Sequence, residues 1–224
     1  LYGQKAVAAG NTSDYHVNAK VNLQAGQNFI TKKGSDGTAT NWTVVTDATS
    51  MQNISLSENS VLGADIDLST VSATNNWTPI SYFTGMFDGL GHTISNLHIN
   101  NSSINSNIGL FGQTYNVDKI ANINLTNVNI TGMYHVGALV GTAIRTHIEN
   151  VSSSGKVVGV FSVGGLVGYM TESPVTLLKS HSSADVSGTD DIGGLVGQLD
   201  NSAIRESYAT GDIIGGYNVG GLVG

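Results

Sequence analysis

One short apolar motif recurs through the second half of the chain and decides its fold. It reads VGALVG at Val136–Gly141, VGGLVG at Val163–Gly168, IGGLVG at Ile192–Gly197 and VGGLVG at Val219–Gly224, with a degenerate copy, NIGLFG, at Asn107–Gly112. The final glycines of successive copies are 29, 27, 29 and 27 residues apart. Self-similarity at such a period is the signature of stacked structural repeats. The sequence therefore predicts a solenoid.

A second pattern fills the interval between copies of the motif. Ile148–Gly159 (IENVSSSGKVVG) aligns without gaps on Ile204–Gly215 (IRESYATGDIIG). One coil thus offers short apolar stretches, for example Val163–Val167, Leu177–Lys179 and Asp185–Val186, separated by Gly, Ser, Asn and Asp. Short strands that repeat at this interval pair in parallel with the coils above and below. We predict an all-β, right-handed parallel β-helix with about three short strands in each 27–29-residue coil.

The motif leaves the inward register of its own strand open. In GGLVG the Leu and the following Val are both apolar and would point to opposite faces of a strand. Its glycines suit positive φ angles at corners and close approach of backbone between coils.

Composition agrees with a repetitive β architecture and excludes several classes of protein. The chain has 29 Gly, 2 Pro and no Cys, and it carries a net charge of −7 with its nine Lys and Arg forming no basic cluster. Without a basic cluster or a thiol we expect no nucleic-acid binding, no disulfide and no thiolate metal site. The chain contains no apolar run of about 18 residues, the length needed to span a bilayer, so membrane insertion is not expected. Leu1–Gly10 lacks a secretion-signal pattern, so we expect the targeting signal to lie elsewhere.

The region before the repeats divides into two parts. Val61–Ser69 (VLGADIDLS) and Phe83–Ile99 (FTGMFDGLGHTISNLHI) look like earlier coils, so we place the solenoid at residues 54–224, with regular repeats from about residue 107. Residues 1–53 contain strand-like runs and form either irregular coils or a separate small β unit.

An asparagine recurs at one place in the coil. Asn96, Asn122 and Asn150 each follow an Ile in an I-x-N pattern, and later coils carry Lys179 and Glu206 there. Amide side chains at equivalent positions can stack and hydrogen-bond along a solenoid. We predict a structural Asn ladder.

The G-[GA]-L-V-G repeats resemble the GLUG motif of bacterial exoproteins. VLGADIDLS followed by FTGMFDGLGHTISNLHI resembles the stretch before such repeats in filamentous-haemagglutinin-like exoproteins of two-partner secretion systems. The resemblance implies a large Gram-negative exoprotein, exported through an outer-membrane pore and secreted or displayed at the cell surface as a β-helical fibre. GLUG repeats also occur in some IgA-specific protease passengers. In either case the repeat is a scaffold, and the resemblance transfers no catalytic residue.

We therefore expect a segment of a surface adhesin whose partner is a host-cell protein or glycan receptor, or another bacterium. The alternatives are a polysaccharide-degrading β-helix enzyme and a spacer stalk of an IgA-protease-like exoprotein. An unpaired parallel edge after Gly224 predicts end-to-end self-association of the isolated chain.

The enzyme alternative requires charged side chains on neighbouring coils. The alignment places Lys156, Asp185 and Asp212 in one column, and Asp190 and Asp191 follow in a nearby turn. Asp185 and Asp212 could bind Ca²⁺, with Lys156 as a base, but a solvated surface ladder is the simpler interpretation. The six His residues lack metal-ligand spacing, and neither G-x-S-x-G nor a phosphate-binding loop is present. We predict no enzymatic activity and no obligatory cofactor.

Aromatic side chains near the coil edges are the candidates for receptor binding. Exposed aromatic residues commonly dominate interfaces. His181 and Tyr208 fall at one aligned position, where ring stacking is expected rather than catalysis. The binding candidates are Tyr115, Tyr134, Phe161, Tyr169 and Tyr217.

Overall fold

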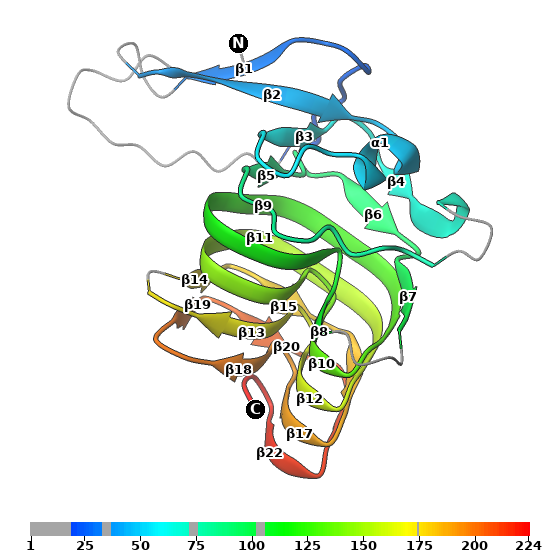
Figure 1. Ribbon diagram of the computed structural model, residues 1–224, viewed down its shortest axis with the longest axis vertical. Coiled ribbons are helices and arrows are strands. Elements are labelled where there is room, and N and C mark those ends of the chain that lie inside the picture. Colours follow the sequence, from blue (N-terminus) through cyan, green and yellow to red (C-terminus); the bar gives the residue numbers. More distant parts are fainter. Residues whose placement is uncertain (1–18, 33–36, 72–75, 102–105, 174) are drawn as a thin grey trace.

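The computed structural model describes residues 19–32, 37–71, 76–101, 106–173 and 175–224. Its strands stack in parallel along one axis, from a hairpin at the N-terminal end to the last coil at the C-terminal end (Figure 1). The predicted parallel β-solenoid is confirmed. In the described ranges, no helix is long and apolar enough to cross a membrane.

The N-terminal part of the stack consists of short elements. β2 pairs antiparallel with β1 and parallel with β3, so the parallel ladder begins before residue 54. The division into two domains at that residue stays a prediction. The elements here are β1 (Phe29–Lys32), β2 (Ala39–Val45), α1 (Ala48–Gln52), β3 (Ser60–Leu62), β4 (Ile66–Asp67), η1 (Leu68–Thr70), β5 (Phe87–Asp88), β6 (Thr93–Ser95) and β7 (His98–Asn100).

The repeats form two parallel sheets that share each coil. β9 (Phe111–Thr131) and β11 (Val140–Val158) are long curved strands that wrap most of their coils. Later coils divide the same path into β13 (Val167–Thr171), β14 (Thr176–Leu178), β15 (His181–Ser182) and β16 (Asp185–Ser187), then β18 (Val196–Leu199), β19 (Ala203–Arg205), β20 (Tyr208–Ala209) and β21 (Ile213–Ile214). The smaller sheet, at the lower right of Figure 1, contains β8 (Ser106–Ile108), β10 (Tyr134–Gly137), β12 (Phe161–Gly164), β17 (Asp190–Gly193) and β22 (Tyr217–Gly220).

The GGLVG motif is a corner between the two sheets. β12 ends at Gly164, the chain bends at Gly165 and Leu166, and β13 begins at Val167. The single strand predicted for Val163–Val167 is therefore wrong. Because the chain turns between them, Leu166 and Val167 are both fully buried, as are their counterparts in the neighbouring coils. The corner thus resolves the register that the sequence left open.

Close backbone contact explains the glycines of this corner. A Cβ added to Gly168 would lie 2.3 Å from the carbonyl carbon of His135 and 2.5 Å from the nitrogen of Val136. At Gly197 the same atom would lie 2.4 Å from the carbonyl carbon of Ser162. These distances are far below van der Waals contact, so the two sheets meet at this edge backbone to backbone. Their φ angles are not positive: among described glycines, positive values occur only outside the motif.

Left-handed corners are occupied by other residues instead. One column of equivalent residues in successive coils lies in the short strands of the smaller sheet and has φ between 46° and 70°. Short polar side chains such as Asn tolerate this conformation best. A second column contains Asn122, Asn150, Lys179 and Glu206, with φ between 49° and 58°. The first column consists of Asn107, His135, Ser162, Asp191 and Asn218.

The predicted Asn ladder is divided between two places. Asn150 Nδ2 donates to Asn122 Oδ1 at 2.8 Å, and Asn122 Nδ2 donates to Asp88 Oδ1 at 2.9 Å. Asn96 lies in a separate ladder, where it accepts from Asn127 at 2.6 Å and donates to Asp67 at 2.8 Å. The prediction that Asn96 stacks with Asn122 is wrong, because Ile94 pairs with Leu125 rather than with Ile120.

The core is a continuous apolar column inside the coils. It contains the buried rings of Phe83, Phe87 and Phe111, whose centroids lie 4.9 Å (Phe83–Phe111) and 5.4 Å (Phe87–Phe111) apart. Some buried hydroxyl groups are paired inside the coils, as when Ser153 donates to the carbonyl of Gly165 at 2.8 Å. Each fully buried Val, Leu, Ile or Phe contributes about 1.5–3 kcal/mol of transfer free energy, so apolar burial stabilises every coil.

We expect Gly168→Ala to lower the free energy of unfolding by about 2 kcal/mol or more, because the new methyl group forces the sheets apart. Urea unfolding followed by circular dichroism measures the loss. Gly221→Ala is the matched control: no atom lies within 4 Å of its added Cβ, and its φ is not positive. Equal stability of the two variants would contradict the backbone-contact explanation.

Candidate functional site

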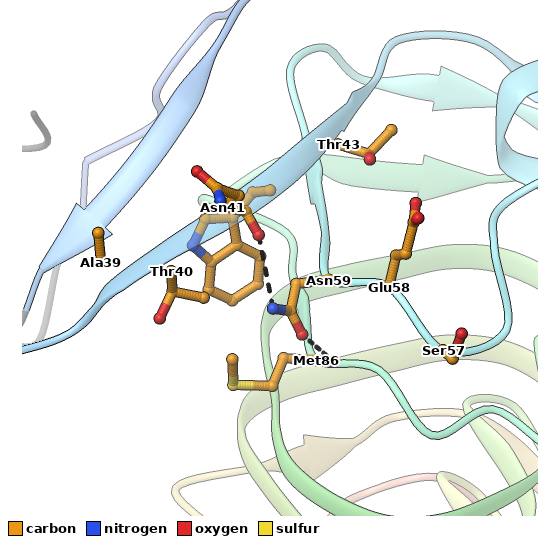
Figure 2. Close-up of a pocket in the computed structure, with 9 residues that line it drawn as sticks. Ala39, Thr40, Asn41, Thr43, Ser57, Glu58, Asn59 and Met86 are labelled. Carbon is orange, nitrogen blue, oxygen red and sulfur yellow. Dashed lines mark hydrogen bonds between the residues drawn. The ribbon is translucent and has the colours of Figure 1, made fainter.

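An open groove of about 590 Å³ lies beside β2 at the N-terminal end of the stack (Figure 2). Thr40 and Asn41 lie on one side of it, Ser57 and Glu58 on the other, and Asn59 between them. The described residues that line it are Ala39, Thr40, Asn41, Trp42, Thr43, Ser57, Glu58, Asn59 and Met86.

The groove exists because β2 diverges from the stack. Thr43–Val45 pairs with β3, whereas Ala39–Trp42 pairs only with β1, on the opposite edge. Thr43 N–H still donates to the carbonyl of Asn59 at 2.8 Å. Alternate residues of a strand direct their backbone N–H and C=O groups to the same edge. The backbone groups of Asn41 therefore face the groove, on the same edge of β2 from which Thr43 bonds to Asn59.

The Asn59 side chain bridges the two walls. Its Nδ2 donates to the carbonyl of Asn41 at 3.4 Å, and its Oδ1 accepts from Met86 N–H at 2.9 Å (Figure 2). Both ends of this amide are therefore engaged, which fixes the spacing of β2 from the next coil.

Most of the remaining described lining is polar, and it includes one aromatic residue. Trp42 is half-buried, packs against the small apolar cluster that contains Phe29, and donates from Nε1 to Thr31 Oγ1 at 2.8 Å. Asn41 and Glu58 are exposed, and Glu58 is the one charged side chain in the described part of the lining. A concave site with a fixed ring and several polar groups is suited to a polar organic ligand.

The sequence did not predict the groove. Trp42 was interpreted as part of a strand-like run, and its Asn and Thr neighbours gave the only signal, a large ring within a polar segment. The divergence of β2 from β3 depends on pairing with β1, which no local pattern specifies.

The predicted charged column is present in register. Lys156 pairs with Asp185, and Asp212 N–H donates to Asp185 Oδ1 at 3.1 Å. Asp190 and Asp191 instead each accept from the side chain of Asn218, at 3.1 and 3.0 Å. A calcium site at Asp185 and Asp212 stays a prediction.

Three of the predicted aromatic residues share the outer face of the smaller sheet. Tyr134 pairs with Phe161, and their rings stack at 5.1 Å with an interplanar angle of 8°. Phe161 pairs with Asp190, which pairs with Tyr217, a residue that is 72% exposed. Asp190 therefore interrupts the aromatic column.

The other aromatic candidates lie in separate columns. Tyr115 stacks on Tyr82 at 5.8 Å, and its hydroxyl accepts from Arg145 at 3.2 Å. Tyr169 packs against His135 with ring centroids 5.2 Å apart. The structure thus does not gather the five candidates into one site, and their role in binding stays a prediction.

The stacking predicted for His181 and Tyr208 is confirmed. The residues pair between β15 and β20, and their rings lie 4.9 Å apart at an interplanar angle of 6°.

Comparison with known families assigns most of the chain. Residues 8–155 match the family described as the M26 IgA1-specific metallo-endopeptidase N-terminal region, and residues 188–214 match the GLUG motif. The first match covers more than half of the chain. The chain belongs to the M26 N-terminal-region family. The GLUG prediction is also confirmed, whereas the stretch likened to filamentous haemagglutinin lies within the M26 match.

Individual relatives place this M26 N-terminal region within much longer proteins. It is 27% identical to an immunoglobulin A1 protease of Streptococcus pneumoniae over 224 aligned positions, which cover 83% of this chain and 11% of that protein. It is 45% identical to halomucin of Haloquadratum walsbyi over 89 residues, 40% of this chain and 1% of halomucin. The chain therefore spans a small part of these relatives.

A solved structure shares the fold. The putative immunoglobulin A1 protease from Bacteroides ovatus superposes with a TM-score of 0.57 at 18% identity, covering 78% of this chain and 68% of that one.

The metal implied by the family's description does not fit the residues described here. In those ranges no group of three or more His, Cys, Asp or Glu side chains could hold a metal ion. The described residues therefore offer no ligand set through which metal-dependent peptide hydrolysis could be derived.

One titratable residue lies in a strained corner of the M26 N-terminal region. His135 has φ 46°, and its Nδ1 lies 3.1 Å from both Asn107 Oδ1 and Thr142 Oγ1. Burial lowers the pKa of His135 from its usual 6.5, because the charged imidazolium loses solvation.

We expect His135→Asn to remove part of the loss of stability at acid pH. Since the folded pKa is below that of the unfolded chain, wild-type stability falls as pH drops through about 6.5, whereas Asn does not titrate and suits the left-handed φ. Urea midpoints measured between pH 8 and pH 5 test this. Parallel profiles for wild type and variant would contradict it.

Proposed function

We propose that this M26 N-terminal region is a non-catalytic scaffold of an extracellular exoprotein, a stalk that spaces other parts of the protein. The observation that carries this proposal is the pair of parallel ladders, one from β2 to β21 and one from β8 to β22, in which each coil pairs with its neighbours. Every added coil lengthens such a stack by about 4.8 Å without requiring a new core.

The comparisons support a stalk within a larger protein. The matched family is by its description a terminal region, and the aligned proteins extend far beyond the aligned part. Secretion, display on a Gram-negative surface and export through an outer-membrane pore by two-partner secretion remain part of this proposal.

Adhesion is the second candidate function, and the groove beside β2 favours it. A stalk that only spaces needs no concave polar site with a fixed aromatic ring. The exposed rings of Tyr208 and Tyr217 give further contact area on other faces. The partner would be a host-cell protein or a glycan receptor.

Incubation of the purified chain with acidic and neutral polysaccharides and with immunoglobulin tests the scaffold. We expect no cleavage products by electrophoresis or reducing-end assay. Cleavage that disappears in Asp185→Ala or Asp212→Ala would replace the scaffold with an enzyme. Retention of chain-coated beads on host cells, with and without EDTA, tests adhesion in parallel, and retention insensitive to EDTA is the expected result.

A further inference from the structure

We propose that the groove beside β2 binds neutral saccharide chains. The proposal rests on the adhesive function above and assigns a site and a ligand class to it. Its observations are the divergence of β2, the fixed indole of Trp42, and the polar side chains that face the same space.

The shape of the groove suits a linear polar chain. Its volume of about 590 Å³ is within the range of ligand sites in proteins, roughly 300–1,000 Å³. It is open along one side rather than enclosed, so a longer oligosaccharide could lie through it with its ends in solvent.

The hydrogen-bonding groups suit a polyhydroxyl ligand. Hydroxyl groups both donate and accept, and the lining supplies side-chain amides, hydroxyls and a carboxylate from Thr40, Asn41, Thr43 and Glu58. The edge of β2 before Thr43 lacks a strand partner on this side and adds backbone groups. A ligand rich in hydroxyl groups can replace water at exposed backbone and side-chain groups one hydrogen bond for another.

Trp42 and Met86 supply the apolar surface that a sugar ring requires. The aliphatic C–H face of a pyranose packs on aromatic and thioether groups, and Trp combines a large apolar area with little conformational freedom. The hydrogen bond from Trp42 Nε1 to Thr31 holds the indole in place before a ligand arrives. A fixed ring lowers the entropy lost on binding.

Charge selects neutral sugars over acidic ones. Glu58 is the only charged residue among the described residues of the lining, and the whole chain carries a net charge of −7. A sialic acid or uronic acid carboxylate placed in the groove would meet a like charge without a compensating cation.

An extended peptide is less suited to the same edge. A peptide would add as a strand to β2, but the Asn59 amide already bridges from Asn41 to Met86 across the path that the strand would follow. Peptide capture is therefore an outcome that would overturn the saccharide proposal.

Titration of the purified chain with neutral oligosaccharides of glucose, galactose, mannose and N-acetylglucosamine, and with their sialylated forms, tests the site. We expect neutral ligands to bind, with at least tenfold weaker binding in Asn41→Ala and in Trp42→Ala. Glu58→Gln should bring sialylated ligands within a few-fold of neutral ones. Asn129→Ala, at an exposed Asn away from the groove, is the matched control.

Circular dichroism separates loss of the site from loss of the fold in Trp42→Ala, and the exposed Asn41 keeps the test valid if that variant unfolds. Four results would each overturn the proposal. Two concern saccharides: binding of neutral ligands that is unchanged in Asn41→Ala, and preference of the wild type for sialylated ligands. The others are binding of no oligosaccharide at all, and capture of extended peptides that requires Asn41. Bead adhesion by the wild type and Asn41→Ala alike would overturn the groove but leave adhesion standing. Oligosaccharide binding without bead adhesion would support the groove as a saccharide site but overturn adhesion as the function.

Discussion

The contact of bare backbone against bare backbone at the GGLVG corner is the constraint on which the rest of the fold depends. At Gly168 and Gly197 the next atom of another coil lies within 2.5 Å of where a Cβ would be. No side chain can separate the two sheets there, so the chain must turn sharply and return on the opposite wall. The turn directs Leu166 and Val167 into the interior together, and repetition of the motif builds a continuous apolar column.

The other corners follow a different physical rule. They turn through left-handed backbone conformations at non-glycine residues, which is why Asn recurs along their columns. Asn also hydrogen-bonds to the coil above it, as Asn150 does to Asn122. Lys179 and Glu206 occupy the same corner without this amide ladder, and they show that stacking of neighbouring coils holds the backbone conformation even where the residue type disfavours it.

The groove arises where the regular ladder ends. From Thr43 onward β2 is a member of the stack, and before it the strand belongs to a hairpin with β1. The space between them is lined by polar side chains because neither wall needs to bury apolar surface. One short segment of chain can therefore contribute to a scaffold and to a binding site. From Thr43 onward it belongs to the repeated parallel stack, and before Thr43, where that stack ends, it lines the groove.

The sequence by itself determined the period, the parallel stacking and the alignment of outer columns, since Lys156 pairs with Asp185 and His181 stacks on Tyr208 as their spacing required. These features follow because successive coils differ in length by only a few residues, so equivalent positions can be aligned from the sequence. Tertiary structure alone decided which ladder holds Asn96, that GGLVG is a corner, and where the groove lies. Each of these depends on register between strands far apart in the chain, and local sequence patterns do not encode the sign of φ or the partner of an irregular coil.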